Sequence, residues 1–450
     1  MGNRYSIARQ FFSVQDTTGQ IGVIWQDKKN KAIKLTKIAN KTFKTITLAN
    51  KQNEILAAAT FDSKGFLYYL TIQDGDGIPN TARTSTLYKA DNNGKFTKSK
   101  NLDGSQAGLN IVMFNGNINN VASLNYANGT LGLILGRKMH PSNDGSNHQG
   151  AIAVVFDANT LDVLKNLGQT SGHSFENVLT VNSDNEFVAI DLGDNYPRGV
   201  NLHRFTENGI TSHVVYTFKT EHSTELRYPA LSAEVNYPKY DAISTDLKTY
   251  YQWSNDNNTY TELGGVIENS DGYSVIFAGE PDLNGNSLNN ARVGNGFDDA
   301  RNIGLVKVVR DFSSGWGNVV PDSMVLSKGT AETGGFYTFN GTWSEQRNAG
   351  VVWLTDYKDK TQTNVSRLKT IKIAEDKILL LWENWNDNSY INTYAMTIDS
   401  LGNVLDKPVT LGNHVRLSRS DDPIIIGNSV YIASGNKADS KLELIELKLK

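Results

Sequence analysis

The residues best suited to chemistry gather in the segment DLGDNYPR, which holds Asp191, Asp194 and Arg198 directly after an apolar run. His173 precedes the same run in the segment SGHSFEN. A histidine one strand away from two carboxylates and an arginine could form a hydrogen-bonded cluster with a perturbed pKa. The alternative is structural. Asp194 then belongs to a tight turn, and Arg198 pairs with a neighbouring carboxylate to hold a loop.

Paired carboxylates are a second possibility. Asp194 with Glu280, or Glu280 with Glu383, could act as acid and base in glycoside hydrolysis if the two groups lay about 5 Å or about 6.5–9.5 Å apart. The catalytic candidates are then His173, Asp194, Glu280 and Glu383. In a chain with 47 acidic residues, however, several carboxylates approach one another by chance.

Aromatic side chains accompany some of these polar residues. Trp382 and Trp385 flank Glu383, and Trp25 lies two residues before Asp27. Flat rings beside carboxylates and amides are suited to stacking on a sugar and hydrogen-bonding its hydroxyl groups. The alternative is that the rings anchor the packing between structural units.

Two acidic, glycine-containing segments could bind calcium. Asp74 and Asp76 alternate with glycine, and Asp282, Asn284 and Asn286 occupy alternate positions in a second segment that contains Gly285. Oxygen ligands at alternate positions with a glycine at the bend are typical of calcium loops. The same spacings are also ordinary turn chemistry, and we expect either no cofactor or calcium.

Composition excludes other chemistries. The chain has no cysteine, which excludes disulfides, thiolate zinc sites, iron–sulfur clusters and cysteine nucleophiles. Neither GxSxG nor HExxH occurs, which argues against an α/β-type serine hydrolase and a catalytic zinc. The net charge of −3 predicts no long-range attraction to nucleic acid or anionic lipid. We find no apolar stretch long enough to cross a membrane, and the first 20 residues lack the apolar centre of a signal peptide.

The elements that must position these residues are short strands. Apolar runs with strand periodicity recur between Asp, Asn and Gly turns, as in the stretch 54–103, which holds four such runs. The same order of strands and turns recurs along the chain, and we count seven copies with an error of one. The last copy offers only three strands, and the segment near Tyr5 could supply a fourth.

A four-stranded unit in six to eight copies resembles a β-propeller, in which blades are arranged radially around a channel. No signature of a specific propeller family is present. The resemblance implies an all-β fold over residues 1–450 as one domain, with polar insertions near 281–302 and 329–350. The alternative is a pair of β-sandwich domains.

In a propeller, the end of each second strand and the start of each first strand emerge on one face, here called the top face. The candidate ligand-binding residues on it are Trp25, Asp27, Asp191, Asp194, Arg198, Trp382, Glu383 and Trp385, and the loops entering first strands add His173, Arg367 and Arg416. We therefore expect a non-catalytic module that binds a glycan or a protein surface. A polysaccharide hydrolase or lyase is the alternative. We expect no nucleic-acid partner and no membrane insertion, and a location outside the cell or in the periplasm if a signal peptide was removed.

Overall fold

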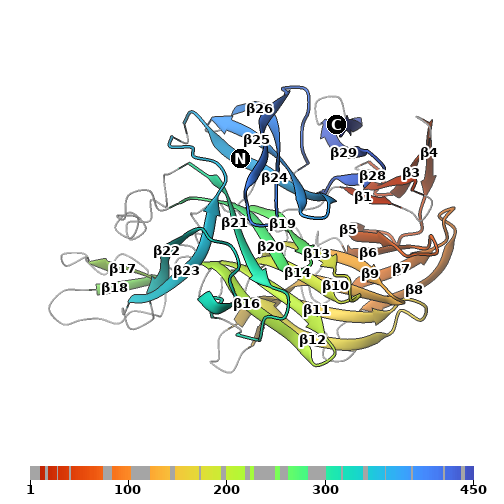
Figure 1. Cartoon of the computed structure of the whole chain (residues 1–450). Helices are drawn as coiled ribbons and strands as arrows, with labels where there is room; N and C mark the ends of the chain where they lie inside the picture. Colours follow the sequence, from red (N-terminus) through yellow and green to blue (C-terminus); the bar gives the residue numbers. More distant parts are fainter. Residues whose placement is uncertain are drawn as a thin grey trace.

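The protein is all-β, and its strands form the seven blades of a β-propeller (Figure 1). The computed structural model describes residues 11–15, 19–27, 29–39, 42–73, 84–102, 122–141, 147–171, 174–193, 199–217, 223–227, 249–253, 262–281, 300–315, 318–337, 343–359, 361–386, 389–418, 421–436 and 441–449. Within these residues the one helical element is a 3₁₀ turn at Asp322–Met324, and no helix is long and apolar enough to span a membrane.

The first four blades each contain four antiparallel strands that follow one another in sequence order. They are β1 (Phe11–Gln15), β2 (Ile21–Gln26), β3 (Ile33–Ala39) and β4 (Thr42–Thr47); β5 (Glu54–Phe61), β6 (Leu67–Gln73), β7 (Ser85–Ala90) and β8 (Phe96–Leu102); β9 (Ala122–Ala127), β10 (Thr130–Pro141), β11 (Asn147–Asp157) and β12 (Val163–Ser171); and β13 (Ser174–Val181), β14 (Phe187–Gly193), β15 (Gly199–Thr206) and β16 (Gly209–Thr217).

The last three blades depart from this pattern. The fifth has the strand order β19 (Glu262–Asn269), β20 (Gly272–Gly279), β21 (Asn302–Val309), β23 (Trp343–Trp353) and β22 (Thr330–Tyr337). The sixth contains β24 (Asn364–Ala374), β25 (Lys377–Asn386), β26 (Ser389–Ile398) and β27 (Val404–Gly412). The seventh has three described strands, β28 (Ile424–Ile426), β29 (Ser429–Asn436) and β30 (Lys441–Lys448), and a separate hairpin pairs β17 (Ser223–Arg227) with β18 (Thr249–Trp253).

The predicted insertion near 329–350 contains strands β22 and β23, which extend the fifth blade. Most of the other predicted insertion, near 281–302, lies outside the described residues, as does Tyr5. The single-domain organisation therefore remains a prediction.

Asp and Asn side chains close the turns between strands. In the β5–β6 turn, the backbone N–H groups of Lys64 and Phe66 each donate to Asp62 Oδ1 at 2.8 Å. Gly65 there has φ +83°, a conformation that glycine adopts without strain. The same arrangement recurs at Asp91 and Asp399. Such short turns allow two strands of a blade to be joined by only a few residues.

Apolar clusters fill the space between neighbouring blades. One cluster spans blades one to three, and others lie between blades three and four, four and five, five and six, and six and seven. The packing is close enough that a Cβ on Gly132 of β10 would lie 2.6 Å from the Phe187 ring of β14. The blades are therefore held mainly by apolar burial.

The ring closes between the seventh and first blades. The innermost strands follow one another as β1, β5, β9, β13, β19, β24 and β28, and β28 lies next to β1 (Figure 1). Phe11, Ile21 and Val23 pack against Ala433 across this junction. Residues far apart in the sequence are thus neighbours at one seam.

Candidate functional site

The top face has the arrangement that the propeller resemblance implies. Gln26, at the end of β2, donates from Nε2 to the backbone oxygen of Glu54 at 2.6 Å and accepts from the N–H of Leu56 at 3.1 Å. Glu54 begins β5, the innermost strand of the next blade. The end of the second strand of the first blade therefore meets the start of the first strand of the next blade at this face.

Glu383, at the top of β25, is the centre of the most highly connected polar cluster on this face. Its side chain has an exposed fraction of 0%. It accepts hydrogen bonds from Arg416 Nε at 3.0 Å, the backbone N–H of Leu417 at 2.8 Å and Trp385 Nε1 at 2.9 Å. Arg416 Nη2 at 3.3 Å and Arg367 Nη1 at 3.4 Å complete the set of donors. A buried carboxylate is thus compensated by two guanidinium groups and two neutral donors.

The two arginines also lie against aromatic rings. The Cζ atoms of Arg367 and Arg416 are 5.5 and 5.6 Å from the centroid of the Trp385 ring, and Arg416 Cζ is 3.9 Å from that of Tyr390. These are cation–π distances. The arginine side chains remain 28% and 37% exposed, respectively. The cluster of Arg367, Glu383, Trp385, Tyr390 and Arg416, called the arginine site below, therefore presents cationic groups to solvent.

Arg367 is held in place by the fifth blade. Its backbone N–H donates to Glu262 Oε2 at 2.5 Å, and its φ of +54° is unusual for a residue with a side chain. Ser366 Oγ donates to the other oxygen of Glu262 at 2.9 Å. Buried Arg301 lies 3.9 Å from Glu262 and donates from Nε to the Val365 oxygen at 2.8 Å. These contacts hold the start of β24 against Glu262 and Arg301 of the fifth blade.

Four of the five members of the arginine site were predicted from the sequence, and Tyr390 was not. The supporting pair Glu262 and Arg301 was not predicted either. Tyr390 lies next to Trp385 in the paired strands β25 and β26, so the hairpin register was the signal that could have found it. Glu262 starts a first strand, a position that the same topology assigns to the top face.

Trp382 belongs to the core. Its side chain is fully buried, its ring stacks on Tyr394 at 5.6 Å, and its Nε1 donates to Asn384 Oδ1 at 3.0 Å. The predicted stacking ring therefore has no exposed face for a sugar, and Trp382 takes the alternative role as a packing anchor. Trp385 is the partly exposed tryptophan of this strand.

Asp191 lies in a buried chain of polar groups in the fourth blade. Its Oδ1 accepts from Asn201 Nδ2 at 2.8 Å and lies 3.3 Å from His203 Nε2, while His203 Nδ1 is 2.7 Å from Ser212 Oγ. The order of Ser, His and Asp resembles a nucleophilic triad. All three side chains are buried, however, so a substrate cannot reach the serine. The chain of contacts instead crosslinks strands β14, β15 and β16.

Trp25 and Asp27 have structural partners. Trp25 packs in the seam between the first and last blades, and its Nε1 donates to Thr36 Oγ1 at 2.9 Å. Asp27 pairs with Lys34 at 2.8 Å and accepts the N–H of Lys29, and these contacts hold the pKa of its carboxyl below the usual value. Both residues serve packing and turn formation here.

Glu280 lies near Tyr216 and Glu332 rather than in the arginine site. Burial raises the pKa of the Tyr216 hydroxyl, and the negative charges of Glu332 and Glu280 raise it further. The hydroxyl donates to Glu332 Oε2 at 3.2 Å. The catalytic pairing of Glu280 with Glu383 remains a prediction. His173, Asp194, Arg198, Asp74, Asp76, Asp282 and Asn284 lie outside the described residues.

No group of three or more His, Asp or Glu side chains is arranged to hold a metal ion within the ranges that the structure describes. The predicted calcium ligands all belong to the undescribed loops, and no observation supports calcium.

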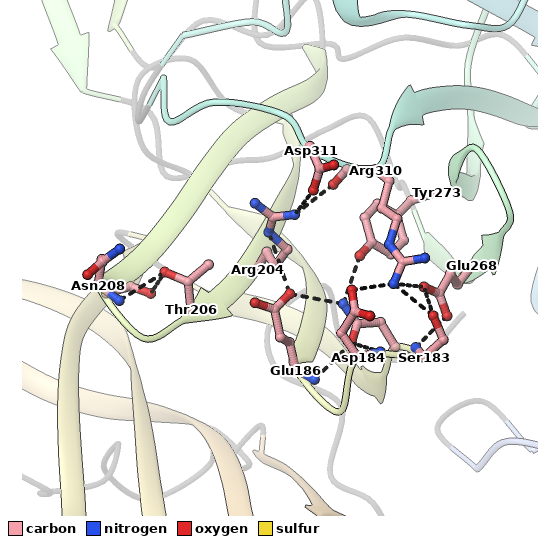
Figure 2. A network of polar contacts seen from close by, with 12 residues as sticks. Ser183, Asp184, Glu186, Arg204, Thr206, Asn208, Glu268, Tyr273, Arg310 and Asp311 are labelled. Atoms are coloured by element: carbon pink, nitrogen blue, oxygen red, sulfur yellow. Dashed lines mark hydrogen bonds and ion pairs between the residues drawn. The ribbon is translucent and has the colours of Figure 1, made fainter.

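A second polar network lies on the opposite face, at the turns of blades four and five (Figure 2). Arg310 contacts Glu268 at 3.3 Å, Ser183 Oγ at 2.8 Å and the carboxylate of Asp184. Arg204 pairs with Asp311 at 2.9 Å in the same view. Both arginines link side chains of blade four to blade five, so the network ties adjacent blades together.

No protein-family model matches the chain, and no curated protein matches it. Among solved structures, the chain is similar to a protein of unknown function from Dyadobacter fermentans, with a TM-score of 0.42, 8% identity, and coverage of 88% of this chain and 96% of that one. It is similar to the SapL1 lectin in complex with alpha methyl fucoside, with a TM-score of 0.33, 8% identity, and coverage of 91% and 97%. An exo-1,5-alpha-L-arabinanase from a bovine ruminal metagenomic library gives a TM-score of 0.30, 9% identity, and coverage of 82% and 100%. The assignment as a seven-bladed β-propeller rests on the strand order and the closed ring of blades.

Proposed function

We propose that the protein is a non-catalytic binding module whose arginine site takes a glycan that carries a carboxylate. The observation that carries this proposal is the convergence of Arg367 and Arg416 on one buried carboxylate beside two aromatic rings. The two arginines come from the first-strand entrances of neighbouring blades. Such a position on a rigid rim is suited to a surface-exposed binding site.

Charge favours an acidic ligand. Two guanidinium groups, Arg367 and Arg416, remain partly exposed around the carboxylate of Glu383, which is itself fully buried. A guanidinium group has five N–H donors in a planar fork that matches a carboxylate. Nε and Nη2 of Arg416 already donate to Glu383, and the partly exposed remainder of the group faces solvent.

The aromatic rings favour a sugar over a small inorganic anion. Trp385 and Tyr390 are both partly exposed and flank Arg416. Rings beside polar donors supply apolar contact for the C–H face of a sugar while the donors bind its oxygens. A protein ligand would use the same donors for a carboxylate side chain.

The contacts of Glu383 support binding over proton transfer. Five protein donors occupy the two oxygens of Glu383, and its side chain is fully buried, so the carboxylate itself is not exposed to a substrate. A general acid or base must lie within hydrogen-bond reach of the reacting proton.

Calorimetric titration with three matched ligands tests the proposal. We expect an oligogalacturonate to bind, and the same oligosaccharide with its carboxylates methyl-esterified to bind at least tenfold more weakly. An acidic peptide of equal charge is the third ligand. Equal affinity for the free and esterified sugars, or binding of the peptide alone, would contradict the proposal, and release of shortened sugar would replace it with the hydrolase or lyase alternative.

A further inference from the structure

A recurring contact joins neighbouring blades near the start of their first strands. A side-chain oxygen of one blade accepts the backbone N–H of a residue in, or just before, the first strand of the next blade, at 2.5–3.1 Å. We call such a pair a junction latch. The acceptors and their donors are Gln26 and Leu56, Glu176 and Leu263, Glu262 and Arg367, Glu383 and Leu417, and Asp421 and Ser13.

The junction latch between the fifth and sixth blades differs from the others in the residue that it holds. Among the five donors, Arg367 alone has a charged side chain and a positive φ, which is +54°. Arg367 lies in a β-bulge, because the register of β24 against β25 is interrupted between Ser366 and Lys369. A bulge bends its strand and re-aims the side chains that it carries. The backbone at Arg367 therefore determines where a guanidinium group of the arginine site lies.

Both carboxylate oxygens of Glu262 contact this bulge. Oε2 accepts from the Arg367 N–H at 2.5 Å, and Oε1 accepts from Ser366 Oγ at 2.9 Å. A positive φ is unfavourable for a residue with a Cβ atom, and it persists where the surrounding structure holds it. Glu262 supplies such a restraint. Because Glu262 is only 5% exposed, its effect on a ligand is exerted through Arg367.

The bulge directs the Arg367 side chain toward the junction of the sixth and seventh blades. Arg367 Nη1 donates to the backbone oxygen of Leu417 at 2.7 Å and lies 3.4 Å from Glu383 Oε1. Its Cζ atom is 5.5 Å from the centroid of the Trp385 ring. The side-chain conformations open to a residue depend on its backbone angles. A change of the backbone at Arg367 would therefore move the guanidinium group away from these partners.

Arg301 offers Glu262 a different role. Its Nη1 lies 3.9 Å from Glu262 Oε1, and Arg301 is 3% exposed. An ion pair between these residues depends on the charge of Glu262, whereas the junction latch depends on how far its oxygen reaches. Substitutions that change the charge and the reach separately can therefore distinguish the two roles.

We infer that Glu262 is a positioning residue of the arginine site, which aims the Arg367 guanidinium group at a ligand by holding the Arg367 N–H. The inference rests on the proposed binding of a carboxylate-bearing glycan at this site. It gives the fifth blade a part in a site whose exposed side chains belong to the sixth blade and to the entrance of the seventh.

Two substitutions separate reach from charge. Glu262→Asp keeps the charge but has a shorter side chain, which draws its oxygen back from the Arg367 N–H, whereas Glu262→Gln loses the charge and keeps an oxygen acceptor at the same reach. In calorimetric titration with oligogalacturonate, Glu262→Asp should bind about tenfold more weakly than the native chain, and Glu262→Gln within about twofold of it. Gln26→Asn is the matched control, because it shortens the acceptor of the latch between the first and second blades, and it should bind as the native chain does.

A double variant tests whether Glu262 acts through Arg367. In the Arg367→Ala background, Glu262→Asp should change the affinity by less than about twofold, because two changes that act on the same contact do not add. A further loss of about tenfold would overturn the inference. A Glu262→Gln protein that binds about tenfold more weakly would assign Glu262 to the ion pair with Arg301 and overturn it, whether or not Glu262→Asp folds. Equal weakening by Gln26→Asn would show a general loosening of the ring and would also overturn it.

Hydrogen exchange of the Arg367 N–H makes the test independent of the ligand. The native chain and Glu262→Gln should protect this amide, and Glu262→Asp should exchange it at least about tenfold faster. Equal exchange rates in the native chain and Glu262→Asp would overturn the inference even where the ligand binds. A native chain that does not bind oligogalacturonate would remove the proposed function, whereas the exchange rates would still decide whether Glu262 holds Arg367.

Discussion

Ser13 of the first blade donates both its backbone N–H and its hydroxyl to Asp421 of the last, at 2.7 and 2.6 Å, across 408 residues of sequence. Asp421 is buried beside the entrance to β28. The two bonds accompany the apolar seam formed by Phe11, Val23 and Ala433. They join the two ends of the ring.

Ser13→Ala should therefore destabilise the protein. The change removes the hydroxyl donor and leaves Asp421 Oδ2 without that partner, which typically costs about 1–3 kcal/mol. Urea denaturation measures the loss. Ser99→Ala, on exposed strand β8, is the matched control and should change the free energy of unfolding by less than about 0.5 kcal/mol. Equal effects of both changes would show that the seam does not depend on this contact.

Asp421 also predicts a pH dependence. Burial raises the pKa of its carboxyl to about 7, against the opposing effect of the Ser13 hydrogen bonds. Since the pKa is higher in the folded state than in the unfolded state, the contribution of this group to stability is fully present below pH 4 and is lost as pH rises to about 7. The shift corresponds to at most about 4 kcal/mol.

The measurement is the free energy of unfolding from pH 4 to pH 8 for the native chain and for Asp421→Asn, which does not titrate. The native chain should lose stability relative to the variant between about pH 4 and pH 7, with no further relative change above that range. A constant difference between the two proteins would show that Asp421 does not titrate in this way.

Trp382 and Trp385 should respond differently to truncation. Trp382→Ala opens a cavity in the core of the sixth blade and should cost about 3–5 kcal/mol. Trp385→Ala removes a partly exposed ring and one donor to Glu383, so we expect a loss below about 2 kcal/mol. Thermal and urea unfolding of both variants measure the two losses in the free energy of unfolding. Similar losses would contradict the assignment of Trp382 to the core.

The ring should unfold as one unit. Apolar clusters join every pair of neighbouring blades, including the last and the first, so no blade has a core of its own. Calorimetry should show a single transition whose van't Hoff and calorimetric enthalpies agree. Two separated transitions would contradict the prediction of one domain over residues 1–450.

Much of the fold could be predicted from sequence because its signals are local. Strand alternation and turn residues such as Asp62 and Asp91 recur in each blade, and the count of seven copies is confirmed. Contacts between segments far apart in the sequence leave no such local pattern. The hydrogen bonds of Ser13 to Asp421, for instance, form only because the last blade packs beside the first.

The candidate site was predicted only in part for the same reason. The top-face topology brought Arg367, Glu383 and Arg416 together, as their positions at strand ends predicted. Trp382 and Trp385 could not both face the ligand, because successive side chains of a strand point to opposite sides and Trp385 shares the side of Glu383.

Calorimetric titration of Arg416→Ala with oligogalacturonate tests whether Arg416 and its neighbours bind a carboxylate on a glycan. We expect the affinity of the variant to be about ten- to a hundredfold weaker, since a charge-assisted, bidentate contact is lost. Arg347→Ala, an exposed arginine that pairs with Asp322 on the fifth blade, is the control and should bind as the native chain does. Unchanged affinity in a folded Arg416→Ala protein, or equal weakening in both variants, would show that Arg416 does not bind the carboxylate of the glycan.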